Sequence, residues 1–179
     1  YALKMNTTGD GNTAIGDAAL NANTTADNNT AIGNQTLKTN TTGANNTAVG
    51  REALYANTTG VGNVAVGKDA LTANTTANYN ASLGYQSLKA NTTGANNTAL
   101  GTTAMYANTT GAGNVAVGYD AMNANTTGTR NLAIGYEAYD ASDTENDNLA
   151  IGYQAMTTNT AGGTKNLAIG NYALDALTS

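Results

Sequence analysis

The 179-residue chain contains no cysteine, proline, histidine, tryptophan or phenylalanine. Without cysteine it cannot form a disulfide or a thiolate metal site. Without histidine it lacks the commonest general base and the commonest transition-metal ligand. Charged residues make up 11% of the chain, and its net charge of −5 excludes the basic surface of a typical nucleic-acid-binding protein. No apolar run approaches the roughly 20 residues that a membrane-spanning helix needs.

What the chain has instead is a repeat with a period of 17 residues, which is marked by glycine. The last step is 18 residues, because one residue is added around Gly162 and Gly163. A fixed period of this kind governs the fold, and the strict register of the apolar residues argues against disorder. We therefore expect residues 1–179 to form one repeat domain of about ten coils. We expect this domain to be a segment of a longer fibre. The marking glycines are Gly16, Gly33, Gly50, Gly67, Gly84, Gly101, Gly118, Gly135, Gly152 and Gly170.

Each unit combines one short strand pattern with one turn pattern. In the unit that begins at Asn114, alternation puts Val115 and Val117 on one face and Ala116 on the other. We expect both valines and the following Met122 to lie inside. The Asn-Thr-Thr-Gly segment is typical of a turn, and 17 residues are too few for a helical repeat of about 33. The predicted fold is all-β, a flattened parallel β-solenoid with one coil per 17-residue repeat and coils about 4.8 Å apart.

Stacking of equal coils places like residues in columns along the rod. One column holds ten asparagines, whose amides we expect to hydrogen-bond along the axis: Asn12, Asn29, Asn46, Asn63, Asn80, Asn97, Asn114, Asn131, Asn148 and Asn166. A second column holds small residues that we predict to face outward and permit close approach of another subunit. This predicted subunit interface consists of Ala14, Ala31, Ala48, Ala65, Ser82, Ala99, Ala116, Ala133, Ala150 and Ala168.

The motifs NTAIG at Asn12–Gly16, NVAVG at Asn63–Gly67 and NLAIG at Asn131–Gly135 resemble the head repeats of trimeric autotransporter adhesins, the YadA-like head. The phrase NTTGANNTAVGREALYANTTG at Asn40–Gly60 also resembles repeats of viral tail fibres and of bacterial surface proteins that end in a self-cleaving trimerisation chaperone. The resemblance covers essentially the whole chain. It implies a left-handed β-roll in which three chains associate through the strand that carries the motif. The 17-residue unit is longer than the usual adhesin-head repeat, which implies larger turns.

These features together predict a structural rod in an extracellular homotrimeric fibre at a cell or virion surface. As an adhesin head or tail-fibre segment, the rod would project or form an attachment surface. Its partners would be copies of itself and a host-surface glycan or protein. We expect no catalytic residue, cofactor, metal, nucleic acid or membrane span. The alternative is a glycan- or ice-binding solenoid that uses a repeated Thr/Tyr face, with Tyr85, Tyr119, Tyr136 and Tyr153 in one outward column.

The turns raise a second interpretation, because Asn-Thr-Thr is also an acceptor sequence for N-glycosylation. The same residues are those that a tight turn requires, so both interpretations stay open. Further sequons begin at Asn28, Asn45, Asn80 and Asn96. Separately, the one acidic cluster, Asp143, Glu145 and Asp147, suggests a solvated loop or a cation site. The candidate glycosylation sites in the turns are Asn6, Asn23, Asn40, Asn57, Asn74, Asn91, Asn108 and Asn125.

Overall fold

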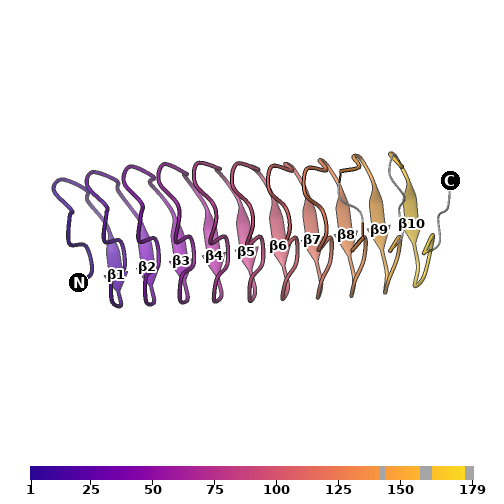
Figure 1. Ribbon diagram of the computed structural model, residues 1–179, viewed down its shortest axis with the longest axis horizontal. Helices are drawn as coiled ribbons and strands as arrows, with labels where there is room; N and C mark the ends of the chain where they lie inside the picture. Colours follow the sequence, from indigo (N-terminus) through magenta and orange to yellow (C-terminus); the bar gives the residue numbers. More distant parts are fainter. Residues whose placement is uncertain (142–143, 158–162, 176–179) are drawn as a thin grey trace.

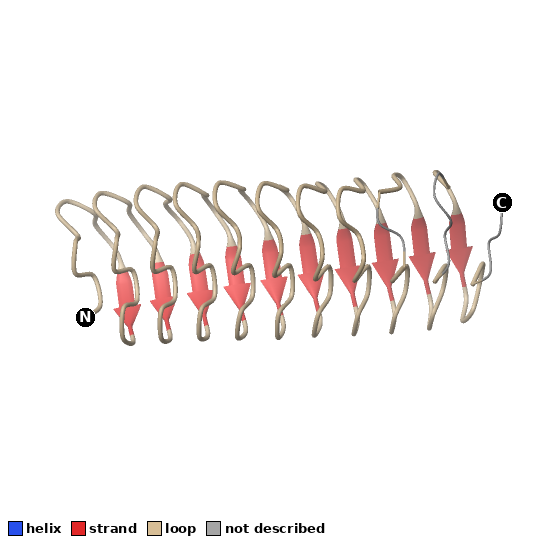
Figure 2. Cartoon of the chain, viewed as in Figure 1, coloured by secondary structure: helices blue, strands red, loops and turns tan. Residues whose placement is uncertain are grey.

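The computed structural model describes residues 1–141, 144–157 and 163–175. The described chain is all-β and winds into a rod, with ten three-residue strands in a single parallel sheet in chain order (Figure 1, Figure 2). The strands are β1 (Thr13–Ile15), β2 (Thr30–Ile32), β3 (Thr47–Val49), β4 (Val64–Val66), β5 (Ala81–Leu83), β6 (Thr98–Leu100), β7 (Val115–Val117), β8 (Leu132–Ile134), β9 (Leu149–Ile151) and β10 (Leu167–Ile169). This architecture confirms the predicted β-solenoid.

The register of the sheet follows the sequence repeat. Thr13 in β1 pairs with Thr30 in β2, a step of one 17-residue unit, and Leu149 in β9 pairs with Leu167 in β10, the step with the added residue. Every strand therefore lies beside the same strand of the next coil. The predicted cause of the longer step, an insertion around Gly162, lies partly outside the described residues.

The prediction of which strand face lies inside was wrong. Ala116 at the centre of β7 is completely buried, whereas Val115 and Val117 on either side of it are only partly covered. The small-residue column predicted as an outward subunit interface is therefore inside a single chain, and only Ala14 in the first coil remains half-buried. The residues of this inward column are Ala14, Ala31, Ala48, Ala65, Ser82, Ala99, Ala116, Ala133, Ala150 and Ala168.

The reason for this reversal is the space between the two walls of the coil. The segment opposite each strand buries two consecutive side chains, such as Ala121 and Met122 in one coil or Ala53 and Leu54 in another. These side chains and the strand's alanine form one continuous apolar core. Because the large side chain comes from the opposite wall, the strand has room for little more than a methyl group. The prediction that Met122 lies inside is confirmed.

Two consecutive side chains can point inward because the opposite wall is not a β-strand. Leu54 and Glu52 both have positive φ angles, 51° and 57°, and the equivalent residues of every coil share this conformation. A left-handed conformation costs a non-glycine residue about 1–2 kcal/mol. Hydrogen bonds between coils hold it: the N–H of Leu54 donates to the carbonyl of Ala70 at 3.0 Å. The strained backbone recurs in every coil and is therefore part of the architecture.

The marking glycines have a steric role at the end of each strand. Gly84 has a φ of +145°, and a Cβ atom on it would lie 2.2 Å from the carbonyl oxygen of Gly101 in the next coil. A side chain at any of these glycines from Gly16 to Gly152 would push neighbouring coils apart. The glycine period is thus a consequence of how closely the coils stack.

The corrected core gives a direct test of stability. We expect Ala116→Leu to lower the free energy of unfolding by about 1–3 kcal/mol, because the larger side chain overpacks the interior. The matched control is Val117→Leu, which adds one methylene to an outward, partly exposed side chain and should change stability by less than about 0.5 kcal/mol. Urea denaturation followed by circular dichroism compares the two. Equal loss of stability in both variants would contradict the burial of the alanine column.

Candidate functional site

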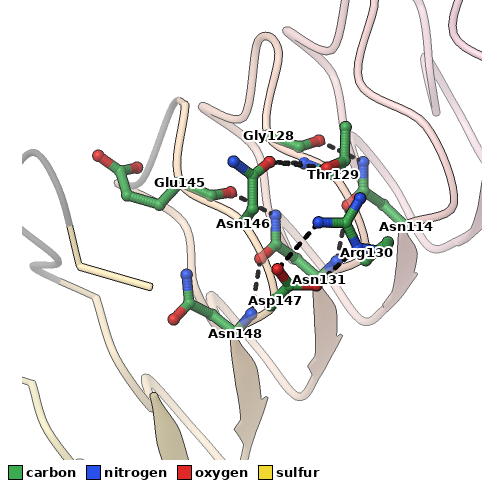
Figure 3. Close-up of polar contacts among 9 residues, drawn as sticks. All are labelled: Asn114, Gly128, Thr129, Arg130, Asn131, Glu145, Asn146, Asp147 and Asn148. Atoms are coloured by element: carbon green, nitrogen blue, oxygen red, sulfur yellow. Dashed lines mark hydrogen bonds and ion pairs between the residues drawn. The ribbon is translucent and has the colours of Figure 1, made fainter. Parts of the chain in front are cut away.

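The asparagine column beside the strands is an inner ladder, and its stacking confirms the prediction. The backbone N–H of Asn131 donates to Oδ1 of Asn114 at 2.8 Å, and that of Asn148 donates to Oδ1 of Asn131 at 2.9 Å (Figure 3). The Nδ2 of Asn131 donates to the carbonyl of Glu145 at 2.7 Å. Each asparagine therefore joins its own coil to both neighbours, through its backbone N–H on one side and its side-chain amide on the other. These side chains are buried, so they hold the rod together and offer nothing to a ligand.

The asparagines of the Asn-Thr-Thr turns form a second buried ladder. Nδ2 of Asn57 donates to Oδ1 of Asn40 at 2.8 Å and to the carbonyl of Gly60 at 3.0 Å. Nδ2 of Asn74 in turn donates to Oδ1 of Asn57 at 2.9 Å. Both hydrogens of each amide nitrogen are thus used inside the protein, where N-glycosylation would have to replace one of them.

For this turn ladder, burial in the folded rod favours the turn interpretation over glycosylation. Seven of the candidates are fully buried: Asn23, Asn40, Asn57, Asn74, Asn91, Asn108 and Asn125. Asn6, at the end of the ladder, is half-buried and donates to Gly9 at 2.9 Å, so glycosylation there stays a prediction. The sequon reflects a turn that requires asparagine for its hydrogen bonds.

The threonines of the turns divide into two columns with different roles. The hydroxyl of Thr58 donates to the carbonyl of Thr75 in the next coil at 3.0 Å, and the same bond recurs along the rod. Thr59, by contrast, is exposed. A flat ice-binding face needs two aligned rows of free hydroxyls on one strand, with alternate residues pointing the same way. One row is engaged internally here, which weighs against the ice-binding alternative.

An apolar stripe runs along the outer face of the sheet, formed by the last residue of every strand. Several of its members are more than a third exposed, including Leu83 at 48% and Leu100 at 43%. The first strand residues flank it and become more apolar toward the C-terminus, from Thr13 to Val115 and Leu149. The apolar stripe consists of Ile15, Ile32, Val49, Val66, Leu83, Leu100, Val117, Ile134, Ile151 and Ile169.

The sequence contained a signal for this stripe that the alternation rule alone did not use. The column at the strand centre never exceeds serine in size, whereas the first strand residue varies among threonine, alanine, valine and leucine. Uniform small size indicates a filled interior, and tolerance of size and polarity indicates an outward position. Side-chain volume, added to periodicity, would have identified the interior correctly.

A tyrosine stack lies where the chain turns after the strands. The rings of Tyr119 and Tyr136 stack with centroids 5.0 Å apart, and Tyr136 and Tyr153 follow at 5.3 Å. Tyr172 meets Tyr153 edge to face at 5.3 Å. The expected outward position of the column of Tyr85, Tyr119, Tyr136 and Tyr153 is confirmed, since these residues are 39–46% exposed. Most ring faces cover one another, so the stack offers ring edges and hydroxyls to solvent.

Carboxylates border the tyrosine stack. Hydrogen bonding to Asp120, together with its charge, raises the pKa of the Tyr119 hydroxyl. Hydrogen bonding to Glu137 raises the pKa of Tyr136 in the same way. Burial, and then the negative charge of Glu137, raises the pKa of Asp140. These aromatic and acidic groups therefore lie within one connected patch.

The predicted acidic cluster of Asp143, Glu145 and Asp147 includes one well-formed ion pair, which Asp147 makes with Arg130. Arg130 donates through Nε and Nη2 to the two carboxylate oxygens of Asp147, at 2.6 and 2.9 Å (Figure 3). Hydrogen bonding to this guanidinium lowers the pKa of Asp147 below its usual value, so the stabilising effect is lost as the pH falls through that lowered pKa. Glu145 is buried, and Asp143 lies outside the described residues.

The described part of the chain has neither a pocket nor a cluster of three His, Cys, Asp or Glu side chains suited to a metal ion. It also has no helix of the length and apolar character needed to cross a membrane. The candidate functional sites are therefore the outer surfaces of the rod, above all the apolar stripe and the turn that carries the tyrosines.

Comparison of the chain with protein-family models, with curated proteins and with solved structures gives no match.

The turn ladder gives a second test. We expect Asn57→Ala to lower the free energy of unfolding by about 1–3 kcal/mol, because it removes the donor to Oδ1 of buried Asn40 and the acceptor for Nδ2 of buried Asn74. The carbonyl of Gly60 loses one of its two hydrogen bonds and keeps the one from Asn46. The control is Thr59→Ala, in which an exposed hydroxyl two residues away is removed. Thermal unfolding of both variants measures the difference. A loss no larger in Asn57→Ala than in the control would contradict the ladder's structural role.

Proposed function

We propose that this chain is the structural rod of an extracellular homotrimeric fibre, an adhesin head or tail-fibre segment that projects or forms an attachment surface. The observation that carries the proposal is the apolar stripe on the outer face of the sheet. All-parallel sheets occur almost only where both faces are covered. In the single chain the inner face is covered by the core and the outer face is only partly covered, which supports a partner surface on that face.

The stripe suits association of rods side by side along their whole length. Full burial of a valine, leucine or isoleucine is worth about 1.5–3 kcal/mol, and the stripe supplies one such residue in every coil. Even partial burial, repeated over ten strands, gives a large total. The stripe also replaces the alanine column as the surface through which copies would meet. The number three comes from the resemblance of the strand motif to trimeric adhesin heads.

A rod of this kind suits projection or display. Each coil is bonded to both neighbours by the sheet and by two asparagine ladders, so the described coils form a continuous, stiff element (Figure 1). Adding repeats lengthens such an element while the packing of its core stays the same, because each repeat contacts only its neighbours. A surface location and a host glycan or protein as the final partner follow from this role as part of the proposal.

A glycan-binding solenoid is the second candidate function, and the observation that favours it is the exposed tyrosine stack. Tyrosine hydroxyls beside Asp120 and Glu137 could hydrogen-bond to sugar hydroxyls. A glycan array probed with the wild-type rod and with a Tyr119→Ala, Tyr136→Ala variant distinguishes the two functions. Specific binding that the variant loses would favour the second candidate over a purely structural rod.

Oligomeric state tests the proposed function. We expect light scattering in high salt to give three times the 18.0-kDa chain mass for the wild type. The variant Val66→Glu, Leu83→Glu, Leu100→Glu should run as a single folded chain, because it would bury three carboxylates without partners.

The control for this test places the same charges on the exposed second threonines of the Asn-Thr-Thr turns, as Thr59→Glu, Thr76→Glu, Thr93→Glu. This variant should stay trimeric. Circular dichroism checks that both variants retain their β structure. A folded wild-type chain that runs as a monomer at micromolar concentration would overturn the trimer.

A further inference from the structure

Most of the basic side chains, and many of the acidic ones, lie along one edge of the rod. We define the turn edge as the first, second and fifth positions after each strand-ending glycine, where the chain reverses (Figure 2). Residues 1–100 have five basic side chains, and all of them lie in these columns: Lys4, Lys38, Arg51, Lys68 and Lys89. The same columns of this half also carry Asp17, Glu52 and Asp69, so five basic and three acidic side chains leave a charge of about +2. After Gly118 the columns carry Asp120, Glu137, Asp140 and Asp175 with no basic residue.

The basic half of the turn edge presents its cations outward. Arg51 and Lys68 have nearby carboxylates, Glu52 at 2.7 Å and Asp69 at 3.8 Å. The cationic side chains are 59% and 48% exposed, however, whereas their acidic partners are 26% and 11% exposed. The outermost charge in these coils is therefore positive.

The same half already pairs lysine with tyrosine inside one chain. The ammonium of Lys38 lies 5.3 Å from the ring centre of Tyr55, and that of Lys68 lies 5.5 Å from Tyr85. Such cation–π contacts are worth about 0.5–1 kcal/mol at exposed sites. In the other half, the stacked tyrosines from Tyr119 onward have carboxylate neighbours instead and make no cation–π contact among the described residues.

We propose that two rods pair side by side in antiparallel orientation through this turn edge, the basic half of each lying on the tyrosine and acidic half of the other. This pairing goes beyond the proposed function, since it joins one fibre to another. The occupant is a second copy because the basic and the acidic halves lie in the same columns of one chain. A two-fold contact requires such self-complementarity.

The coil order fixes a register for this pairing. A two-fold axis between the turns at Gly84 and Gly101 sets the fourth coil against the seventh, and the third against the eighth. Lys68 then faces the coil of Tyr119 and Asp120, and Arg51 faces the coil of Tyr136 and Glu137. Lys38 similarly faces the coil of Tyr153. Each of these three cations meets an aromatic ring, and two of them also meet a carboxylate.

The same charges oppose the parallel arrangement. If two rods lay parallel and in register, lysine would meet lysine, and Asp120 would meet Asp120. Like-charge contacts of this kind discriminate against the wrong partner geometry. Because the groups are exposed, the antiparallel contact depends on charge and weakens as salt shortens the Debye length.

Sedimentation velocity at two salt concentrations tests the pairing. At about 10 mM salt, where the Debye length is about 30 Å, we expect the rod to sediment with twice the mass that it has at about 1 M, where that length is about 3 Å. At high salt the sedimenting particle is three chains if the proposed trimer forms, and one chain if it does not. The doubling is a separate measurement, so failure of the pairing and failure of the trimer are distinguishable.

Charge reversal gives the decisive variants. Lys68→Glu with Arg51→Glu, and separately Asp120→Lys with Glu137→Lys, should each abolish the low-salt doubling. An equimolar mixture of the two variant proteins should restore it, because every half then meets its opposite charge. The control Thr42→Glu, Thr59→Glu, Thr76→Glu, Thr93→Glu changes the net charge as much as the first variant, away from the turn edge, and should still double.

Three outcomes would overturn the proposal. They are an undoubled wild type at low salt, doubling that survives both charge reversals, and a mixture of the two variants that stays undoubled. If the undoubled wild type instead binds a polylysine peptide through Asp120 and Glu137, the acidic half serves a basic partner other than a second copy, and the antiparallel pair is wrong.

Discussion

Hydrogen bonding between consecutive coils, at one fixed spacing, is the interaction on which the rest of this structure depends. It joins the strands, the opposite wall and both asparagine ladders, so each coil is built on the last. The spacing leaves no room for a side chain at the strand-ending glycines from Gly16 to Gly152. Every buried column must then repeat almost without change, since a residue that alters the spacing at one coil also disturbs the two beside it.

Much of the fold could be predicted from the sequence, because a fold made of equal stacked coils requires a sequence repeat of the same length as the coil. Periodicity located the strands and their register, and it identified Met122 as a core residue. It could not say which strand face is inside, since alternation only groups residues that share a face. That decision depends on how much volume the opposite wall already fills, and this wall uses left-handed residues such as Leu54 to turn two adjacent side chains inward. No pattern of period two anticipates such a wall.

The candidate sites were harder to predict than the fold, for a related reason. Asn57 has the same neighbours in sequence whether it is a surface acceptor for a sugar or a buried rung of a ladder. Only the three-dimensional stack shows that both hydrogens of its amide are already engaged. The apolar stripe was missed because its valines and isoleucines were assigned to the interior. In these strands the usual expectation reverses: the larger side chains lie outside, and the alanine at the strand centre packs against the leucines and methionines of the opposite wall.

Uniform columns inside the rod leave the outer columns as the only place where one coil can differ from another. The core is nearly the same in every coil, so it cannot tell a partner where along the rod it lies or which way the rod points. That information resides in the exposed residues: threonine gives way to valine and leucine along the sheet, and lysine gives way to aspartate and glutamate along the turns. Residues 1–100 carry five basic and five acidic side chains, while residues 101–179 carry two and seven. The whole net charge of −5 thus belongs to the second part of the chain, which gives a repetitive rod a direction that a partner can recognise.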